Sequence, residues 1–287
     1  MRSSNPVFTR RGFSRDGGYA GFNAGPQPQT GNPYAGSPAN PYAPQPGNPY
    51  APQPQVGPDG GYAPVTPTRP GVMTIDSVVS RTAITLGTVV AAAAVAWVAD
   101  LPLGLGIVFA LVAMGLGLWQ SFKREPSPPL ILAYAVTEGL FLGAISSAIN
   151  AAAPGAAMQA VIGTMAVFAG VLFMYKQRII RVTARFTQFV LAAALGFVLL
   201  SAVNLIVLMI GGGNGLGLRD GMLGVAFGVI GIILGACFLA LDFKMVEDGI
   251  AYGAPEKESW LAAFGLTLTL VWIYLEFLRL IAILQGD

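Results

Sequence analysis

Residues 222–241 read MLGVAFGVIGIILGACFLAL, a run of twenty residues without a charged side chain. A helix of about 20 apolar residues crosses a bilayer whose hydrocarbon core is about 30 Å thick, so this stretch is long enough to span a membrane. Of the 287 residues in the chain, 54% are hydrophobic and 10% are charged. Because a water-soluble domain carries about 25% charged residues, this composition predicts an integral membrane protein.

Seven windows of this kind follow residue 72, and proline and glycine fall mainly between them. The windows are Val78–Val98, Leu103–Phe122, Leu130–Asn150, Ala157–Tyr175, Phe189–Ile210, Met222–Leu241 and Leu261–Leu284. We therefore expect an all-α membrane protein in which residues 72–287 form a seven-transmembrane-helix bundle. An alternative with six spans would require one window to be a re-entrant segment.

The Lys and Arg residues predict the orientation of the spans, because positively charged loops stay on the cytoplasmic side. With the N-terminus inside, the inner side holds fourteen of the 16 basic residues, namely Arg2, Arg10, Arg11, Arg15, Arg69, Arg81, Lys123, Arg124, Lys176, Arg178, Arg181, Arg185, Lys244 and Lys257. The outer side holds only Arg219, while Arg279 lies within the last window. This asymmetry predicts an N-in, C-out, multi-pass protein of the cell membrane with a cytoplasmic N-terminus.

Residues 1–71 have a different composition, with 15 of the 21 prolines, 12 of the 37 glycines and no long apolar run. The motif Asn-Pro-Tyr-Ala recurs there at Asn32, Asn40 and Asn48. Proline at this density fixes φ and removes amide donors, so we expect a disordered cytoplasmic tail rich in polyproline-II conformation. The tail could bind the aromatic groove of a partner protein, or it could act only as an entropic arm.

The chain contains no histidine and a single cysteine, Cys237. Catalysis by Ser-His-Asp or Cys-His groups and histidine ligation of metals are therefore excluded. We expect no enzymatic activity and no cofactor, and a response to pH near neutrality would have to come from carboxylates. The net charge of +2 also gives no basic surface for nucleic acid, so the lipid bilayer is the expected environment.

Three acids, Glu138, Asp242 and Glu276, fall in or at the edge of the apolar windows. A charged carboxylate at the bilayer centre costs about 2.5–3.5 kcal/mol on insertion scales, so such residues usually face a bundle interior and are functional candidates. Structural alternatives remain open for two of them. Glu276 could pair with Arg279 three residues later on the same helix, and Glu138 could pair with a nearby arginine such as Arg81.

Helical spacing places Asp242 on a packing face. Glycines recur at steps of three and four, at Gly221, Gly224, Gly228, Gly231 and Gly235, and the same face continues through Phe238 to Asp242. Because glycine lets another backbone approach closely, we expect this face to contact a neighbouring helix.

The last window has a comparable face, on which Glu276 follows Ala262, Gly265 and Thr269. For two antiparallel helices, residues equidistant from the connecting turn lie at equal depth. Asp242 and Glu276 are equidistant from Ser259, so they could meet if the sixth helix continues to about Tyr252; an offset of a turn or two is the alternative. Two carboxylates that meet in a bundle would share a proton and could attract a hard cation such as calcium.

These segments carry a resemblance to a known family. LALDFKMVEDGI at 239–250 resembles the end of helix six in the transmembrane Bax inhibitor motif family, specifically its bacterial seven-helix members, and LTLTLVWIYLEFLRLIAIL at 266–284 resembles the last helix of that family. Leu241 and Phe243 stand where the family usually has Tyr and Thr, and Glu276 stands where Asp is usual. The resemblance implies a bacterial plasma-membrane protein that leaks calcium in a proton-sensitive way. It also implies that the family's pair of acids falls on Asp242 and Glu276. The basic residue that latches this pair in the family is not assigned to a particular arginine of this chain.

The leading hypothesis is thus a pH-sensitive calcium or cation leak channel. Asp242 and Glu276 would act as the gate, the pH sensor and transient calcium ligands, and Glu138 would be an ion-path or structural residue. The alternative is a non-conducting membrane scaffold or stress-response regulator whose tail recruits a protein partner. A proton-coupled transporter is a third class, for which no inverted repeat is visible.

Overall fold

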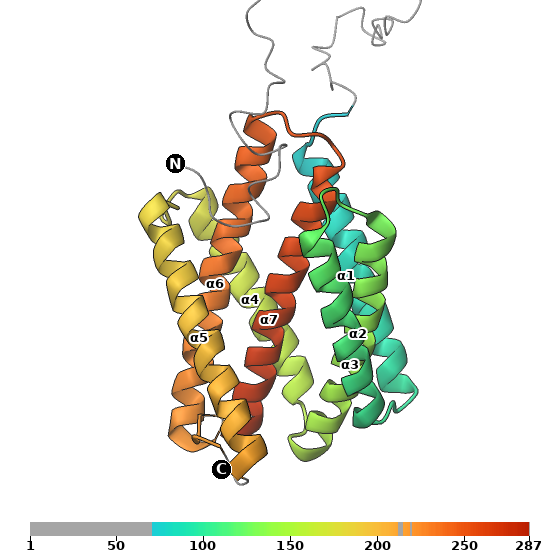
Figure 1. The fold of residues 1–287 in the computed structure, drawn as a ribbon, viewed down its shortest axis with the longest axis vertical. Helices are drawn as coiled ribbons and strands as arrows, with labels where there is room; N and C mark the ends of the chain where they lie inside the picture. The colour runs from blue at the N-terminus through green and yellow to red at the C-terminus, as the bar shows by residue number, and fades with distance from the viewer. Residues whose placement is uncertain (1–70, 212–214, 219, 287) are drawn as a thin grey trace, which may run out of the picture. The chain divides into compact units, whose positions relative to one another are not determined.

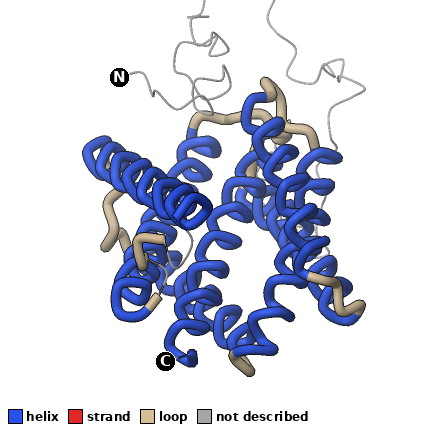
Figure 2. The backbone as a smooth tube through the Cα atoms, turned by 60° about the horizontal axis from the view of Figure 1, so that its bottom comes forward, coloured by secondary structure: helices blue, strands red, loops and turns tan. Residues whose placement is uncertain are grey.

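The computed structural model describes residues 71–211, 215–218 and 220–286, so the predicted tail lies outside the described residues. These residues form seven helices joined by short loops (Figures 1 and 2). The helices are α1 (Ile75–Val98), α2 (Leu103–Phe122), α3 (Pro128–Ala152), α4 (Ala156–Lys176), α5 (Ala184–Gly211), α6 (Gly221–Ala251) and α7 (Glu258–Gly286). All seven are long and apolar enough to cross a membrane, which confirms the seven-helix prediction over the six-span alternative.

Helix α7 occupies the centre of the bundle. It packs against α1, α3, α4 and α6 (Figure 1). Helix α2 packs on α3, whereas the backbone of α5 packs on α6 alone among the described helices. The side chain of Phe197 on α5 reaches further, because its ring stacks on Phe227 of α6 and lies 5.6 Å from the ring of Trp272 on α7.

Glycines allow the closest helix contacts, as expected where small residues permit backbones to approach within a membrane. On α3, the Cα atoms of Gly139 and Gly143 lie directly against the backbone of α1. On α6, a Cβ added to Gly231 would lie 2.7 Å from the carboxylate carbon of Glu276 on α7. The glycine face predicted for α6 is therefore the face that meets α7.

The N-terminal end of α1 is joined to the α6–α7 turn. Thr74 caps α1 in a reciprocal capping box with Ser77. Just before the cap, the Met73 amide donates a hydrogen bond to the Ala254 carbonyl oxygen (2.8 Å), and the Glu256 amide donates one to the carbonyl oxygen of Gly71 (2.8 Å). We call these contacts, together with the bonds of Ser77 and Arg81 to the same turn, the α1 clasp.

Two side chains complete the α1 clasp. The hydroxyl groups of Ser77 and Ser259 are hydrogen bonded at 2.7 Å. The guanidinium of Arg81 donates to the carbonyl oxygen of Glu256 and forms an ion pair of 2.7 Å with its carboxylate. It also lies over the ring of Trp260, 5.5 Å from the ring centroid. Residues far apart in the sequence therefore fix the turn of the α6–α7 hairpin.

Candidate functional site

Asp242 lies on the face of α6 that meets α7, as the glycine spacing predicts. The hydroxyl group of Thr269 on α7 donates a hydrogen bond of 2.6 Å to Asp242 Oδ2. Gly265, one turn earlier on α7, lies beside the carboxylate, since a Cβ added there would be in ordinary contact with Asp242 Oδ1 at 3.6 Å. No cation is paired with Asp242 among the residues that the structure describes.

Glu276 has a different environment further along α7. Its carboxylate accepts a hydrogen bond from Arg279 and forms an ion pair with it, which is the i, i+3 pairing considered in the sequence. The guanidinium of Arg279 also lies over the ring of Phe227 on α6, 5.6 Å from the ring centroid. Glu276 itself packs against Gly231. The pair of opposite charges is thus held between α6 and α7.

The structure does not bring Asp242 and Glu276 together. Asp242 lies opposite Thr269, seven residues before Glu276 on α7, which corresponds to about 10 Å along the axis at about 1.5 Å per residue. The expectation of a directly contacting acid pair is therefore wrong, and the alternative with an offset of about two turns holds.

The connecting turn explains this offset. Helix α6 ends at Ala251, close to the predicted extension to Tyr252, but α7 already begins at Glu258. The centre of the hairpin therefore lies near residue 254 instead of at Ser259. Two contacts between the helices agree with this position, because the midpoint in sequence lies near residue 254 for Gly231 with Glu276 and also for Asp242 with Gly265.

Glu138 lies on α3 and is buried, with 9% of its surface exposed. The possibility of a pair with Arg81 is wrong, because Arg81 belongs to the α1 clasp and bonds to Glu256. No hydrogen bond or ion pair joins Glu138 to another described residue. It lies on α3, whereas Asp242 lies on α6, and both of these helices pack against α7.

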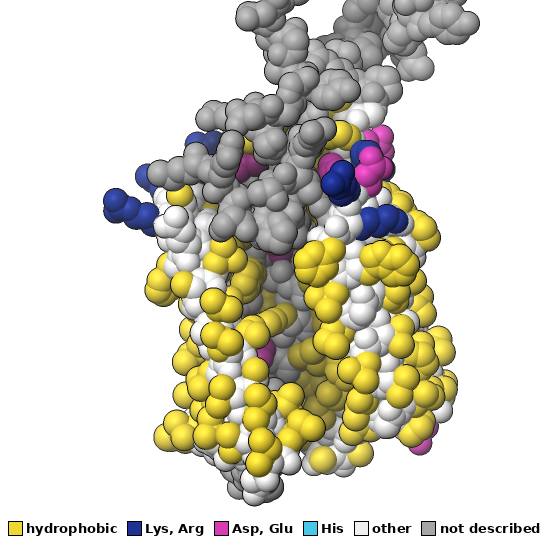
Figure 3. Space-filling model, viewed as in Figure 1, with side chains coloured by type: hydrophobic (Ala, Val, Ile, Leu, Met, Phe, Trp, Pro, Cys, Tyr) yellow, Lys and Arg dark blue, Asp and Glu magenta, His cyan; other side chains and the backbone are white. Residues whose placement is uncertain are grey.

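One face of the bundle is hollowed between two apolar flanks, and some acidic atoms are visible in the hollow (Figure 3). Within the described ranges, no three Asp, Glu or Cys side chains gather closely enough to hold a metal ion. A resident calcium cage at Asp242 and Glu276 therefore does not fit their positions, whereas transient contact of a cation with either carboxylate stays a prediction.

Two residues of this region were not recognised as partners from the sequence. Thr269 was placed on the face of Glu276, yet its hydroxyl serves Asp242. The hydroxyl groups of Tyr274 on α7 and Ser146 on α3 are hydrogen bonded at 2.6 Å, and this bond joins α7 to α3. The sequence signal for Thr269 was its position on the small and polar face of α7; Tyr274 had none.

Comparison with known proteins agrees with this architecture. The family model described as Bax inhibitor 1 like matches residues 5–286, nearly the whole chain. A search of curated proteins finds no match. The extent of the family match, together with the seven apolar helices, shows that the chain is a multi-pass membrane protein that belongs to the Bax inhibitor 1 like family.

Proposed function

We propose that the protein is a passive, pH-sensitive cation leak, with calcium as the ion, and that the permeation path follows the interface of α6 and α7. The observation that carries the proposal is the unequal neutralisation of the two acids. Arg279 neutralises Glu276, whereas Asp242 receives only the hydroxyl hydrogen bond of Thr269 among the described residues. Asp242 is therefore the carboxylate whose protonation changes the net charge within the interface.

The proposed gate follows from that charge. A protonated Asp242 is neutral, and α6 and α7 then pack closely around their glycines. A deprotonated Asp242 places an uncompensated charge in a low-dielectric bundle, which favours entry of water and of a hard cation that prefers oxygen ligands. Glu276 supplies a second carboxylate about two turns away when Arg279 releases it. Flux is thus expected to increase as the pH rises.

Calcium flux in liposomes that contain the purified protein, measured from pH 5 to pH 8, tests this proposal. Asp242→Asn should abolish the rise of flux with pH, because the amide cannot titrate. Glu276→Gln should lower the flux but leave a rise with pH. Glu125→Gln, which alters an exposed acid of the α2–α3 turn, is the matched control and should behave as the unchanged protein. A pH profile that survives in Asp242→Asn would refute the gate.

Deletion of the N-terminal tail distinguishes the cation leak from the scaffold hypothesis. Deletion of residues 1–70 should leave calcium flux intact if the helices conduct, because every contact described above lies after residue 70. An absence of flux at any pH in the full-length protein, with the fold intact, would instead favour a scaffold. We propose a cytoplasmic N-terminus in the cell membrane for either role, from the distribution of Lys and Arg.

A further inference from the structure

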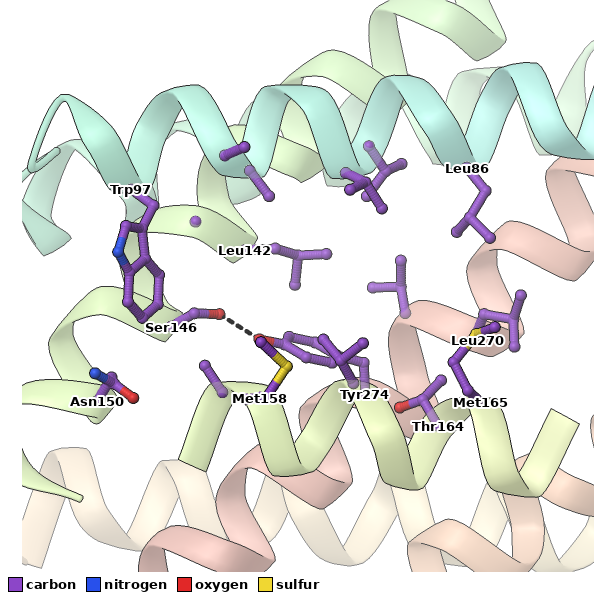
Figure 4. Close-up of a pocket in the computed structure, with 18 residues that line it drawn as sticks. Leu86, Trp97, Leu142, Ser146, Asn150, Met158, Thr164, Met165, Leu270 and Tyr274 are labelled. Atoms are coloured by element: carbon purple, nitrogen blue, oxygen red, sulfur yellow. Dashed lines mark hydrogen bonds between the residues drawn. The ribbon is translucent and has the colours of Figure 1, made fainter. Parts of the chain in front are cut away.

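A cavity of about 510 Å³ lies between α1, α3, α4 and α7 (Figure 4), away from the interface of α6 with α7. Its floor consists of buried side chains, including Leu142, Leu270 and Val271. Its rim consists of exposed side chains of α1 and α4, including Val90 and Met158. Over the described ranges, the backbones of α1 and α4 do not approach each other within 8 Å. The cavity is therefore open between these two helices, on a surface that faces lipid.

Polar groups gather at one end of this cavity. Trp97 and Asn150 line it close to the ends of their helices, since α1 ends at Val98 and α3 ends at Ala152. The hydroxyl groups of Ser146 and Tyr274 form a hydrogen bond of 2.6 Å on the same side (Figure 4). This pair has two hydroxyl hydrogens and uses one of them internally, so one remains for an acceptor.

The other end of the cavity is apolar. Leu86, Leu270 and Met165 line it, and the hydroxyl of Thr164 is already bonded to the carbonyl oxygen of Ala160. Figure 4 shows this end opposite Trp97 and Asn150. The cavity therefore has one polar end near the membrane surface and one apolar end near the middle of the bundle, which is the polarity of a lipid in one leaflet.

The length of the cavity agrees with the same occupant. Leu86 and Trp97 are eleven residues apart on α1, which corresponds to about 16 Å at about 1.5 Å per residue. One leaflet contributes half of a hydrocarbon core of about 30 Å, or about 15 Å. The volume also lies in the range of about 300–1,000 Å³ that is common for small-molecule sites.

We propose that this cavity binds one acyl chain of a membrane phospholipid. The chain enters between α1 and α4, its ester carbonyl accepts a hydrogen bond from the Ser146–Tyr274 pair, and its methyl end lies near Leu86 and Leu270. The lipid comes from the leaflet that meets the α1–α2 and α3–α4 turns. Because Tyr274 belongs to α7, the bound chain would stabilise the position of the central helix. This inference does not rest on ion conduction.

Photo-crosslinking of the full chain tests the proposal. The probe is a phospholipid with a diazirine midway along one acyl chain, in vesicles of phosphatidylethanolamine and phosphatidylglycerol. Bulk lipid reaches only exposed side chains, so labels on the buried floor residues Leu142, Thr164 and Leu270 would show that a chain enters. Labels confined to exposed positions such as Leu195 and Ile206 would overturn the proposal.

A pair of variants on α4 provides the second measurement. Ala157 lines the cavity, whereas Ala166 is exposed on the same helix and is not part of the lining. Ala157→Phe should lower labelling of the floor residues several-fold, and Ala166→Phe should leave it unchanged. An equal effect of both variants on floor labelling would contradict an acyl-chain site. The label map of the unchanged protein decides the question even if Ala157→Phe fails to fold.

Discussion

Thr269 on α7 donates a side-chain hydrogen bond of 2.6 Å to the carboxylate of Asp242 on α6. The bond fixes the register of two helices whose remaining contacts are made largely by glycines. It also gives Asp242 a neutral partner in an interface where Glu276 has a charged one. Removal of either partner therefore tests a different property of the interface.

Replacement of Thr269 by valine should lower the stability of the protein. Valine keeps the shape of threonine but leaves a partly buried carboxylate oxygen without its donor, which costs about 1–3 kcal/mol. The midpoint of thermal unfolding in detergent should decrease. Thr88→Val is a suitable control, because the Thr88 hydroxyl bonds only within its own helix to Ile84. Equal midpoints for the two variants would show that the Asp242 contact contributes nothing to stability.

Gly231→Ala should destabilise the α6–α7 interface. The added methyl would lie 2.7 Å from the carboxylate carbon and 3.1 Å from Cγ of Glu276. Because the ion pair with Arg279 holds this side chain in place, the methyl would overpack the interface at a cost of about 1–3 kcal/mol. Gly196→Ala provides the matched control, because a Cβ at that position in α5 has nothing within 4 Å. It should be neutral or slightly stabilising, since alanine is about 1 kcal/mol better than glycine within a helix. Thermal unfolding compares the two, and stabilisation by both would contradict close packing at Gly231.

Arg81→Met should weaken the α1 clasp. The substitution keeps an apolar stem but removes the ion pair with Glu256 and the contact with Trp260. Because one partner is largely buried, we expect a loss of about 1–3 kcal/mol. Lys257→Met should cost about 0–1 kcal/mol, since its pair with Glu125 is exposed. Urea unfolding of both variants measures the difference, and a larger loss for Lys257→Met would argue against the clasp.

The predicted orientation can be tested with single cysteines. In a Cys237→Ala background, Glu125→Cys places a thiol in the α2–α3 turn, and Pro154→Cys places one in the α3–α4 turn. In intact cells, a membrane-impermeant maleimide should label the second variant only. Permeabilised cells, in which both variants should react, give the control. Labelling of Glu125→Cys alone would reverse the orientation.

The helices were predictable from the sequence, whereas the register between them was not. Each apolar window reflects the thickness of the bilayer, and its composition alone predicts a span. The glycine spacing similarly predicts which face of α6 meets α7. The depth of Asp242 relative to Glu276 depends on where α7 begins, and charged turn residues can continue either helix. Glu258 already begins α7 here, which moved the hairpin centre by several residues.

Contacts between helices distant in the sequence were also beyond prediction. Arg81 could have approached Glu138 or Glu256 by charge alone, and only the packing of α1 against the α6–α7 turn selects Glu256. The acyl-chain cavity depends on a space that four helices leave between them. The residue pattern of a single helix cannot predict a cavity that is formed between four helices.

The α1 clasp determines how the two central helices can move. It anchors the connecting turn through Gly71, Met73 and Arg81, so α6 and α7 cannot slide past each other at that end. The two helices can then move relative to each other mainly by a hinge motion about the connecting turn. Displacement then grows with distance from the turn, so Asp242 shifts less than the helix surfaces around Gly231 and Glu276, which lie further from the turn. A small change at Asp242 would thus be amplified at Glu276.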